Sequence, residues 1–247
     1  MGLAGSCWRA GAGLILAALA GCGDFATPAA NVAEANPQSQ LTATRDTDPS
    51  EPLAKIEKPT LADIAKPGPL PERFLGRRDA PVTIYYYASL TCPYCRAFHA
   101  KGLPELKRLY IDKGKVRLVV REFPIGKSAG TATIALRCAE EGKYFRLLDR
   151  YLAEQGSWVS QEVRHDAILA VAKKEGMTEQ AYNSCLANQS MINGLKAVKE
   201  RGRQLGVIGT PSFFVEETRL KPNPSLEDMK AAIDAALARK GTVAKSE

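Results

Sequence analysis

Several features that mark other classes of protein are missing from this sequence. It has no long run of Lys or Arg, and its formal net charge is a modest +7, which argues against a nucleic-acid-binding protein. It has one Cys-x-x-Cys motif but neither a second one nor a pair of neighbouring histidines, so it lacks the usual ligands of a tetrahedral zinc site. No internal repeat is visible. The composition is that of a globular protein. Its excess of basic residues indicates a solvated basic surface, and weak attraction to anionic lipid is the alternative interpretation.

The N-terminus lacks an apolar run long enough to span a bilayer. Residues 10–20 are apolar over about a dozen positions, whereas a membrane-spanning helix needs about 20. The run follows a single charge, Arg9, and matches the hydrophobic region of a secretory signal. The stretch Leu19–Cys22 resembles the lipobox of bacterial lipoproteins, which implies cleavage before Cys22 and lipid on its sulfur. Ordinary cleavage after Ala20 is the alternative. We predict a signal peptide over residues 1–21 and export in either case.

Aromatic residues are absent between Phe25 and Phe74, and bulky apolar residues are scarce there. Prolines recur throughout the stretch, at Pro28, Pro37, Pro49, Pro52, Pro59, Pro67, Pro69 and Pro71. Such a segment cannot bury enough apolar surface to offset the entropy lost on ordering. We therefore predict a disordered, Pro-rich linker over residues 22–71 that tethers a domain to a membrane, with Thr60–Lys66 as its only candidate helix. It shows no sustained heptads of the kind that an assembly module would need.

The folded domain is predicted over residues 72–240, followed by a disordered tail at 241–247. It begins with a strand-helix-strand pattern. Residues 81–90 are almost continuously apolar, β-branched and aromatic, as in a strand buried on both faces, and 115–124 read as a second such strand. Residues 96–114 between them have helical spacing, with Pro104 expected to kink the helix. Two strands joined in this way are expected to be parallel.

A helical block interrupts the strand pattern. Residues from about 126 to 206 carry only helical periodicities. Strand-like sequence returns at 212–217 and 218–221, and a last helix opens at Ser225–Asp228 with the spacing of a capping box. One sheet with an insertion accounts for this order. We predict an α/β fold with an all-helical insertion at about 126–206.

The Cys92-Pro93-Tyr94-Cys95 motif follows the first predicted strand directly. A thiolate attacks a disulfide and a thiol does not, so a redox enzyme must lower the pKa of one cysteine. Cys92 at a helix N-terminus would face unpaired N–H groups that favour negative charge, and Pro93 suits the first helical turn. Cys95, one turn further in, would release the mixed disulfide. We predict a redox-active pair in which Cys92 attacks.

Two other readings of the motif remain open. A metal site could use Cys92, Cys95 and His99, and an inert disulfide is conceivable although it would close too small a loop to add much stability. His99 follows Cys95 by one helical turn, where it either tunes the thiols or is an ordinary half-buried histidine. Tyr94 is expected to be exposed where a substrate arrives, or else to be an aromatic filler. We predict no bound metal and no organic cofactor.

Export places the chain where disulfides persist. Cys7 leaves with the signal and Cys22 is accounted for by lipidation, so four cysteines remain and allow three pairings. The spacing favours Cys92 with Cys95, which leaves Cys138 with Cys185. That bridge would close a loop of about 48 residues and contribute roughly 4 kcal/mol by chain-entropy arguments. Two separate buried thiols are the alternative.

Three features together resemble a known family: the CPYC motif after an apolar strand, the helical insertion, and GTPSFFV at Gly209–Val215. They are similar to the DsbA-like thiol–disulfide oxidoreductases of bacterial envelopes, which have a thioredoxin fold, over roughly residues 72–239. The resemblance implies a cis bond at Thr210–Pro211, in a loop that faces the cysteines and pairs with an extended substrate chain. A trans-proline turn is the alternative. A second disulfide like Cys138–Cys185 occurs in some members.

Two features leave parts of this resemblance open. The hairpin after the proline loop, Glu216–Pro224, lacks the Gly- or Asn-rich turn that is common in the family, so an irregular hairpin is expected. CPYC and a Thr before the proline also occur in relatives that reduce or isomerise disulfides.

We expect an exported oxidoreductase that passes the Cys92–Cys95 disulfide to cysteines of envelope proteins. Its expected partners are reduced or unfolded exported proteins, a membrane protein that resets the pair, and a membrane held through a lipid anchor on the periplasmic side. The alternatives are a reductase or isomerase of the same fold, a copper- or zinc-binding chaperone, and a structural lipoprotein whose cysteines only staple the chain.

Overall fold

The computed structural model describes residues 54–140 and 142–243. The chain divides after Pro49 into two units, and all described residues belong to the second. The predicted signal peptide, Cys22, the linker up to residue 53 and the last four residues of the tail therefore lie outside the described residues. Among the helices that are described, none combines the length and apolar character that crossing a membrane requires.

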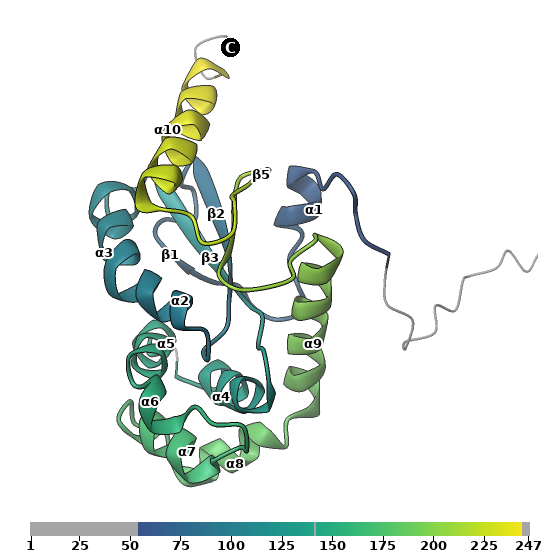
Figure 1. Ribbon diagram of the computed structural model, residues 1–247, viewed down its shortest axis with the longest axis vertical. Coiled ribbons are helices and arrows are strands. Elements are labelled where there is room, and N and C mark those ends of the chain that lie inside the picture. Colours follow the sequence, from purple (N-terminus) through teal and green to yellow (C-terminus); the bar gives the residue numbers. More distant parts are fainter. Residues whose placement is uncertain (1–53, 141, 244–247) are drawn as a thin grey trace, which may run out of the picture. The chain divides into compact units, whose positions relative to one another are not determined.

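A mixed sheet of five strands forms the centre of the described chain (Figure 1). Its strands are β1 (Arg73–Leu75), β2 (Val82–Ala88), β3 (Val116–Glu122), β4 (Ser212–Val215) and β5 (Thr218–Arg219). Their order is β1-β3-β2-β4-β5, in which β2 and β3 are parallel and the other pairs antiparallel. All seven residues of β2 are buried, which explains its almost continuous apolar sequence. The predicted parallel pair is confirmed.

Helices cover both faces of the sheet. The segment from β2 to β3 holds α2 (Pro93–Ala97), η1 (Phe98–Gly102), α3 (Leu103–Leu106) and η2 (Lys107–Ile111), where η1 and η2 are π-helical. The disturbance expected at Pro104 takes the form of the π-helical stretch before it, in which the Leu103 N–H bonds to the Phe98 carbonyl. These helices and α10 (Leu226–Val243) pack on one face, while α1 (Leu61–Ala65) and α9 (Gln189–Gln204) lie on the other.

The all-helical insertion is confirmed. It consists of α4 (Lys127–Arg137), α5 (Tyr144–Ala153), α6 (Gln155–Trp158), α7 (His165–Lys173), α8 (Glu179–Leu186) and α9. In Figure 1, α4 to α8 gather beyond the end of the sheet at which α2 begins. The capping box predicted for the last helix is also present, since the Ser225 N–H donates to Asp228 Oδ2 at 2.8 Å and Asp228 N–H returns a bond to Ser225 Oγ.

The linker prediction was wrong in its last part. Residues from about 54 onward are integrated into the fold: α1 has a capping box at Thr60 and buries Ile64 against the sheet face that contains Tyr85 and Phe214. Arg201 of α9 also donates to the Asp63 carbonyl at 2.7 Å. A few apolar residues suffice here because the sheet face supplies the rest of the apolar surface.

Three smaller expectations also need correction. Strand β1 was not predicted, because three half-buried residues at a sheet edge are too few to show a period. The tail predicted at 241–247 begins later, since α10 continues to Val243. The hairpin expected to be irregular is a tight turn at Glu216–Glu217 between paired Val215 and Thr218, with Glu216 at a φ of 53°.

Candidate active site

Cys92 lies where β2 passes into α2. Three residues separate the end of β2 from Cys92, which is the N-cap residue of α2, and Pro93 occupies the first helical position. The Cys92 carbonyl accepts the first bond of the helix, from the Arg96 N–H at 3.1 Å. Cys92 is 9% exposed and Cys95 is fully buried, and both are free thiols. The chain geometry therefore makes only the first sulfur reachable from solvent.

A second segment closes the site from the opposite side. The Thr210–Pro211 peptide bond is cis and leads into β4, whose Ser212 pairs with Tyr87 near the end of β2. When it is protonated, the Cys92 thiol donates to the Thr210 carbonyl, with 3.0 Å between sulfur and oxygen. The structure thus places the proline loop directly against the cysteine motif, although more than a hundred residues separate the two in the sequence.

The two thiols differ in acidity. The hydrogen bond from the Cys95 thiol is the largest of the effects that lower the pKa of Cys92 to about 5, and the Thr210 side chain and the N–H groups of Cys95 and Tyr94 act in the same direction against burial. Burial raises the pKa of Cys95, and the neighbouring Cys92 sulfur raises it further. At neutral pH Cys92 is therefore a thiolate and Cys95 a thiol, and the Cys95 thiol donates a hydrogen bond to the Cys92 thiolate.

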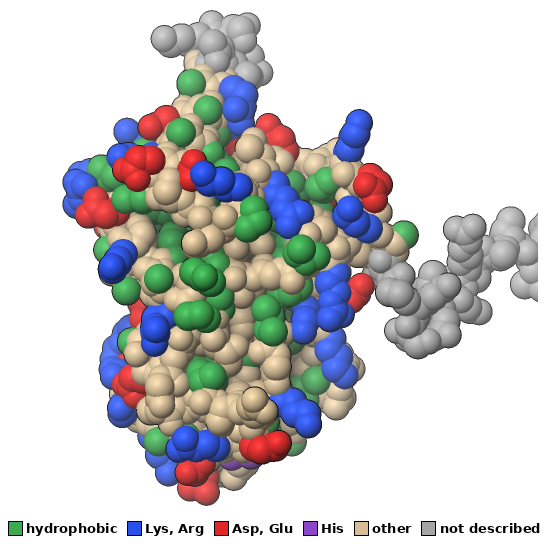
Figure 2. Space-filling view, viewed as in Figure 1, with side chains coloured by type: hydrophobic (Ala, Val, Ile, Leu, Met, Phe, Trp, Pro, Cys, Tyr) green, Lys and Arg blue, Asp and Glu red, His purple; other side chains and the backbone are tan. Residues whose placement is uncertain are grey.

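Several large apolar side chains are exposed, and two of them, Tyr94 and Ile208, lie in or next to the segments that meet at Cys92. Among the described residues the full set is Tyr94, Ile125, Val159 and Ile208. Tyr94 stands between the cysteines at 57% exposure, and Ile208 lies just before the proline loop at 93%. Ile125 is tied to the motif, because its carbonyl accepts from Thr91 Oγ1 at 3.2 Å. Figure 2 shows apolar side chains over the region where Figure 1 places the start of α2, with Lys and Arg more often toward the edges of this face.

The hydrogen-bond partner of His99 is Asp149 and neither of the two sulfurs. Its Nδ1 lies 2.6 Å from Asp149 Oδ1, and its side chain is only 5% exposed. Its ring lies 5.7 Å from that of Tyr86, a fully buried side chain that interacts electrostatically with the Cys95 thiol. The described residues contain no group of three or more His, Cys, Asp or Glu side chains arranged to hold a metal ion.

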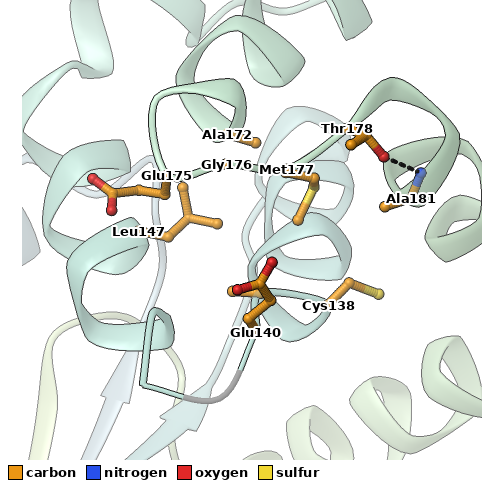
Figure 3. A pocket seen from close by; sticks show the side chains of 10 residues that line it. Cys138, Glu140, Leu147, Ala172, Glu175, Gly176, Met177, Thr178 and Ala181 are labelled. Atoms are coloured by element: carbon orange, nitrogen blue, oxygen red, sulfur yellow. Dashed lines mark hydrogen bonds between the residues drawn. The ribbon is translucent and has the colours of Figure 1, made fainter.

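The other two cysteines are joined to each other. A disulfide links Cys138, at the C-terminal end of α4, to Cys185 in α8, with their Cα atoms 6.2 Å apart. A pocket of about 180 Å³ lies beside the bridge in the insertion, lined by Cys138, Met177 and Thr178 among others (Figure 3). Its most deeply buried carboxylate, Glu175, is already paired with Arg146 and Arg150. This pocket shows no free reactive group and is not part of the thiol site.

Two buried polar groups were missed by the sequence analysis, and the first of them contacts the cysteine motif. Gln155 of α6 donates to the carbonyl oxygens of Leu90 and Cys92, at 2.7 and 3.0 Å. Glu122, at the end of β3, is buried and paired with Arg137. In the sequence, Gln155 and Glu122 each give only one signal, which is a polar residue at a buried position of an amphipathic segment. The partner of each residue lies far along the chain.

Comparison with known proteins agrees with this geometry. The family model described as thioredoxin matches residues 70–235. A protein of Rickettsia bellii named as a protein-disulfide oxidoreductase is 33% identical over 165 residues, 66% of this chain and 63% of the relative. Disulfide bond formation protein D of Bacillus cereus is 29% identical over 172 residues, 67% of this chain and 79% of the relative.

A solved structure is similar over a comparable part of the chain. The crystal structure of alpha-DsbA1 from Wolbachia pipientis superposes with a TM-score of 0.65 at 25% identity, and covers 72% of this chain and 96% of that one. The match to the Rickettsia bellii protein spans less than two thirds of that protein's length. With the sequence, the sheet order and the insertion in agreement, this chain belongs to the thioredoxin family, and its fold is similar to that of alpha-DsbA1.

Proposed function

We propose that this protein is an exported dithiol oxidase that passes the Cys92–Cys95 disulfide to cysteine pairs of other exported proteins. One observation carries the proposal: the reachable sulfur has its pKa lowered to about 5 while its buried neighbour has its pKa raised. A stabilised thiolate favours the reduced state of the pair, so the disulfide readily gives up its bond to a substrate. The same asymmetry makes Cys92 the sulfur that a substrate reaches.

The reaction requires two exchanges. A substrate thiolate attacks Cys92 Sγ of the disulfide, the Cys92–Cys95 bond breaks, and the Cys95 sulfur leaves and takes up a proton. A second substrate thiolate then attacks the substrate sulfur of the mixed disulfide and releases Cys92 as a thiolate. The substrate loses two electrons and the pair gains two. A membrane partner with an oxidising disulfide or quinone would restore the pair, so no bound cofactor is needed.

The surroundings of Cys92 suit an unfolded chain as substrate. An extended chain can pair with the backbone of the Thr210–Pro211 loop, whose carbonyl is already within 3.0 Å of the sulfur. Tyr94, between the cysteines, and Ile208, just before the proline loop, present exposed apolar surface. A reduced exported protein exposes apolar segments before it folds, so this surface favours substrates that have not yet folded.

The cellular setting is proposed from the sequence. A signal of the lipoprotein type with Cys22 lipidated would hold the protein at a bacterial membrane, on the periplasmic side of the cell envelope. This is the compartment in which disulfides form and persist. Acyl labelling of the full chain, with Cys22→Ser as control, tests the anchor directly.

The redox equilibrium with glutathione decides the direction of electron flow. We expect a reduction potential on the order of −120 to −180 mV, the oxidising end of thioredoxin-fold proteins. The protein should also oxidise a reduced, unfolded substrate stoichiometrically, whereas Cys92→Ser should not. A potential near −270 mV, as in reducing members of the fold, would contradict the oxidase assignment and favour a reductase. Faster recovery of a scrambled substrate than of a reduced one would favour an isomerase.

A further inference from the structure

One buried amide from the insertion binds the backbone on both sides of Thr91. Gln155 Nε2 donates one hydrogen to the Leu90 carbonyl at 2.7 Å and the other to the Cys92 carbonyl at 3.0 Å. Gln155 is only 6% exposed, so neither bond competes with bulk water. A primary amide has two donors, and here both are used on the segment that carries the reactive sulfur. The insertion and the cysteine motif are thus joined by side chain to main chain.

Gln155 is itself held firmly. It is the first residue of α6, and Trp158 at the other end of that helix is fully buried and donates from Nε1 to the Tyr151 carbonyl at 2.8 Å. Because its helix is anchored, the Gln155 side chain loses its rotational freedom when the protein folds. Its amide therefore acts as a fixed pair of donors rather than a mobile one.

The two carbonyls matter for the sulfur because of their charge. A carbonyl oxygen carries partial negative charge, and one turned toward a thiolate would destabilise it. The Cys92 carbonyl accepts both from Gln155 and from the Arg96 N–H, so its oxygen is directed into the protein and along the helix. The N–H groups of Tyr94 and Cys95 at the start of α2 lower the pKa of Cys92, so their position relative to the sulfur depends on this backbone staying in place.

We propose that Gln155 is a positioning residue for thiol exchange: by holding the Leu90 and Cys92 carbonyls, it fixes the backbone segment that places the Cys92 sulfur at the N–H groups of the helix start. The inference rests on the proposed function only in taking Cys92 as the reacting sulfur, and it holds for either direction of electron flow. The insertion thereby contributes to the chemistry as well as to the fold.

Gln155→Met and Gln155→Glu test this role. Met has a similar length but no donor, and Glu has a similar shape but adds a negative charge when ionised. In reduced protein, we expect Gln155→Met to lower the acid dissociation constant of Cys92 by about threefold to tenfold, and ionised Gln155→Glu to lower it further. Thiolate absorbance in the ultraviolet as a function of pH measures this. The glutathione equilibrium should shift by a similar factor toward the disulfide.

Tyr151→Phe provides the matched control. Tyr151 Oη donates to the Ile168 carbonyl at 3.0 Å, so this change also removes a buried bond to a carbonyl within the insertion, but not one to a carbonyl of the cysteine motif. It should lower the free energy of unfolding without altering Cys92 ionisation. The proposal is overturned if Gln155→Met behaves in the same way, with lower stability but unchanged ionisation and glutathione equilibrium.

The Gln155 variants still test the positioning role if one variant does not fold or if the oxidase assignment fails. If Gln155→Met does not fold, Gln155→Glu decides, since it retains one donor when protonated and should lose its normal Cys92 ionisation only as its carboxyl ionises. An unchanged Cys92 titration in Gln155→Glu would overturn the proposal. If the unaltered protein oxidises no substrate, the oxidase assignment fails, and the Cys92 titration of the Gln155 variants still tests the positioning role.

Discussion

The Sγ atom of Cys92 lies 3.0 Å from the carbonyl oxygen of Thr210. The thiol at the start of α2 and the loop before β4 therefore form one site. Strand β2 aligns them, because α2 follows β2 in the chain and β4 pairs with β2 in the sheet.

Replacing Cys95 should make Cys92 less acidic. The hydrogen bond from Cys95 is the largest of the effects that hold the pKa of Cys92 at about 5. In Cys95→Ala we expect that pKa to rise by at least about one unit, because one charge-assisted hydrogen bond is removed. The pH dependence of alkylation of the single remaining active-site thiol measures it. An unchanged midpoint would show that the helix N–H groups and Thr210 account for the acidity alone.

The stability of the reduced protein should depend on pH through Cys92. Its pKa is lowered on folding from an ordinary value of 9.0 to about 5, so the stabilisation is fully present above pH 9 and is lost as the pH falls through 5. We expect a difference on the order of 2 kcal/mol between pH 4.5 and pH 9, after allowing for solvent near the sulfur.

Urea unfolding of the reduced protein at several pH values measures this difference. Cys92→Ala is the control, because it removes the ionising group, and its unfolding free energy should follow the other titrating groups alone. If the two proteins showed parallel pH profiles between 5 and 9, the lowered pKa of Cys92 would be contradicted.

The Cys138–Cys185 disulfide should stabilise the fold without taking part in exchange. It closes a loop across 47 positions between α4 and α8, so Cys138→Ala with Cys185→Ala should cost roughly 4 kcal/mol of unfolding free energy. The rate of exchange at Cys92 should not change. Thermal unfolding and a glutathione exchange assay measure the two effects, and a large change in the Cys92 potential would indicate a redox role for the bridge instead.

The exposed apolar side chains should matter for protein substrates and not for small thiols. Ile208 is 93% exposed and Tyr94 57% exposed, so each can be replaced by Ser at little cost to the fold. Losing one apolar contact should raise KM for a reduced, unfolded protein by about threefold to tenfold, while exchange with glutathione stays within about twofold.

A polar exposed residue far from the motif, such as Lys113 in the turn before β3, provides the control for these two substitutions. Lys113→Ser should leave both rates unchanged. Equal loss of activity toward glutathione and toward the protein substrate would instead show that Ile208 or Tyr94 acts on the reactivity of Cys92 itself.

Local patterns in the chain predicted much of what positions the site. The apolar run at β2, the helical spacing after Cys95 and the unbroken helical periodicity of the insertion each depend on neighbours within a few residues. The same holds for the capping box at Ser225. The linker boundary and β1 were missed because their burial depends on a sheet face built by residues far along the chain.

The sequence by itself determined which atoms can do the chemistry and where in a helix they stand, because cysteine spacing and Pro93 act through the local backbone. The tertiary structure decided which sulfur is reachable, what surrounds it and in which direction the pKa of each thiol is shifted. Burial of Cys95, the approach of Thr210 and the two bonds from Gln155 all join segments far apart in the chain. Contacts of that kind arise only when packing brings such segments together, and no local sequence pattern encodes the distance between them.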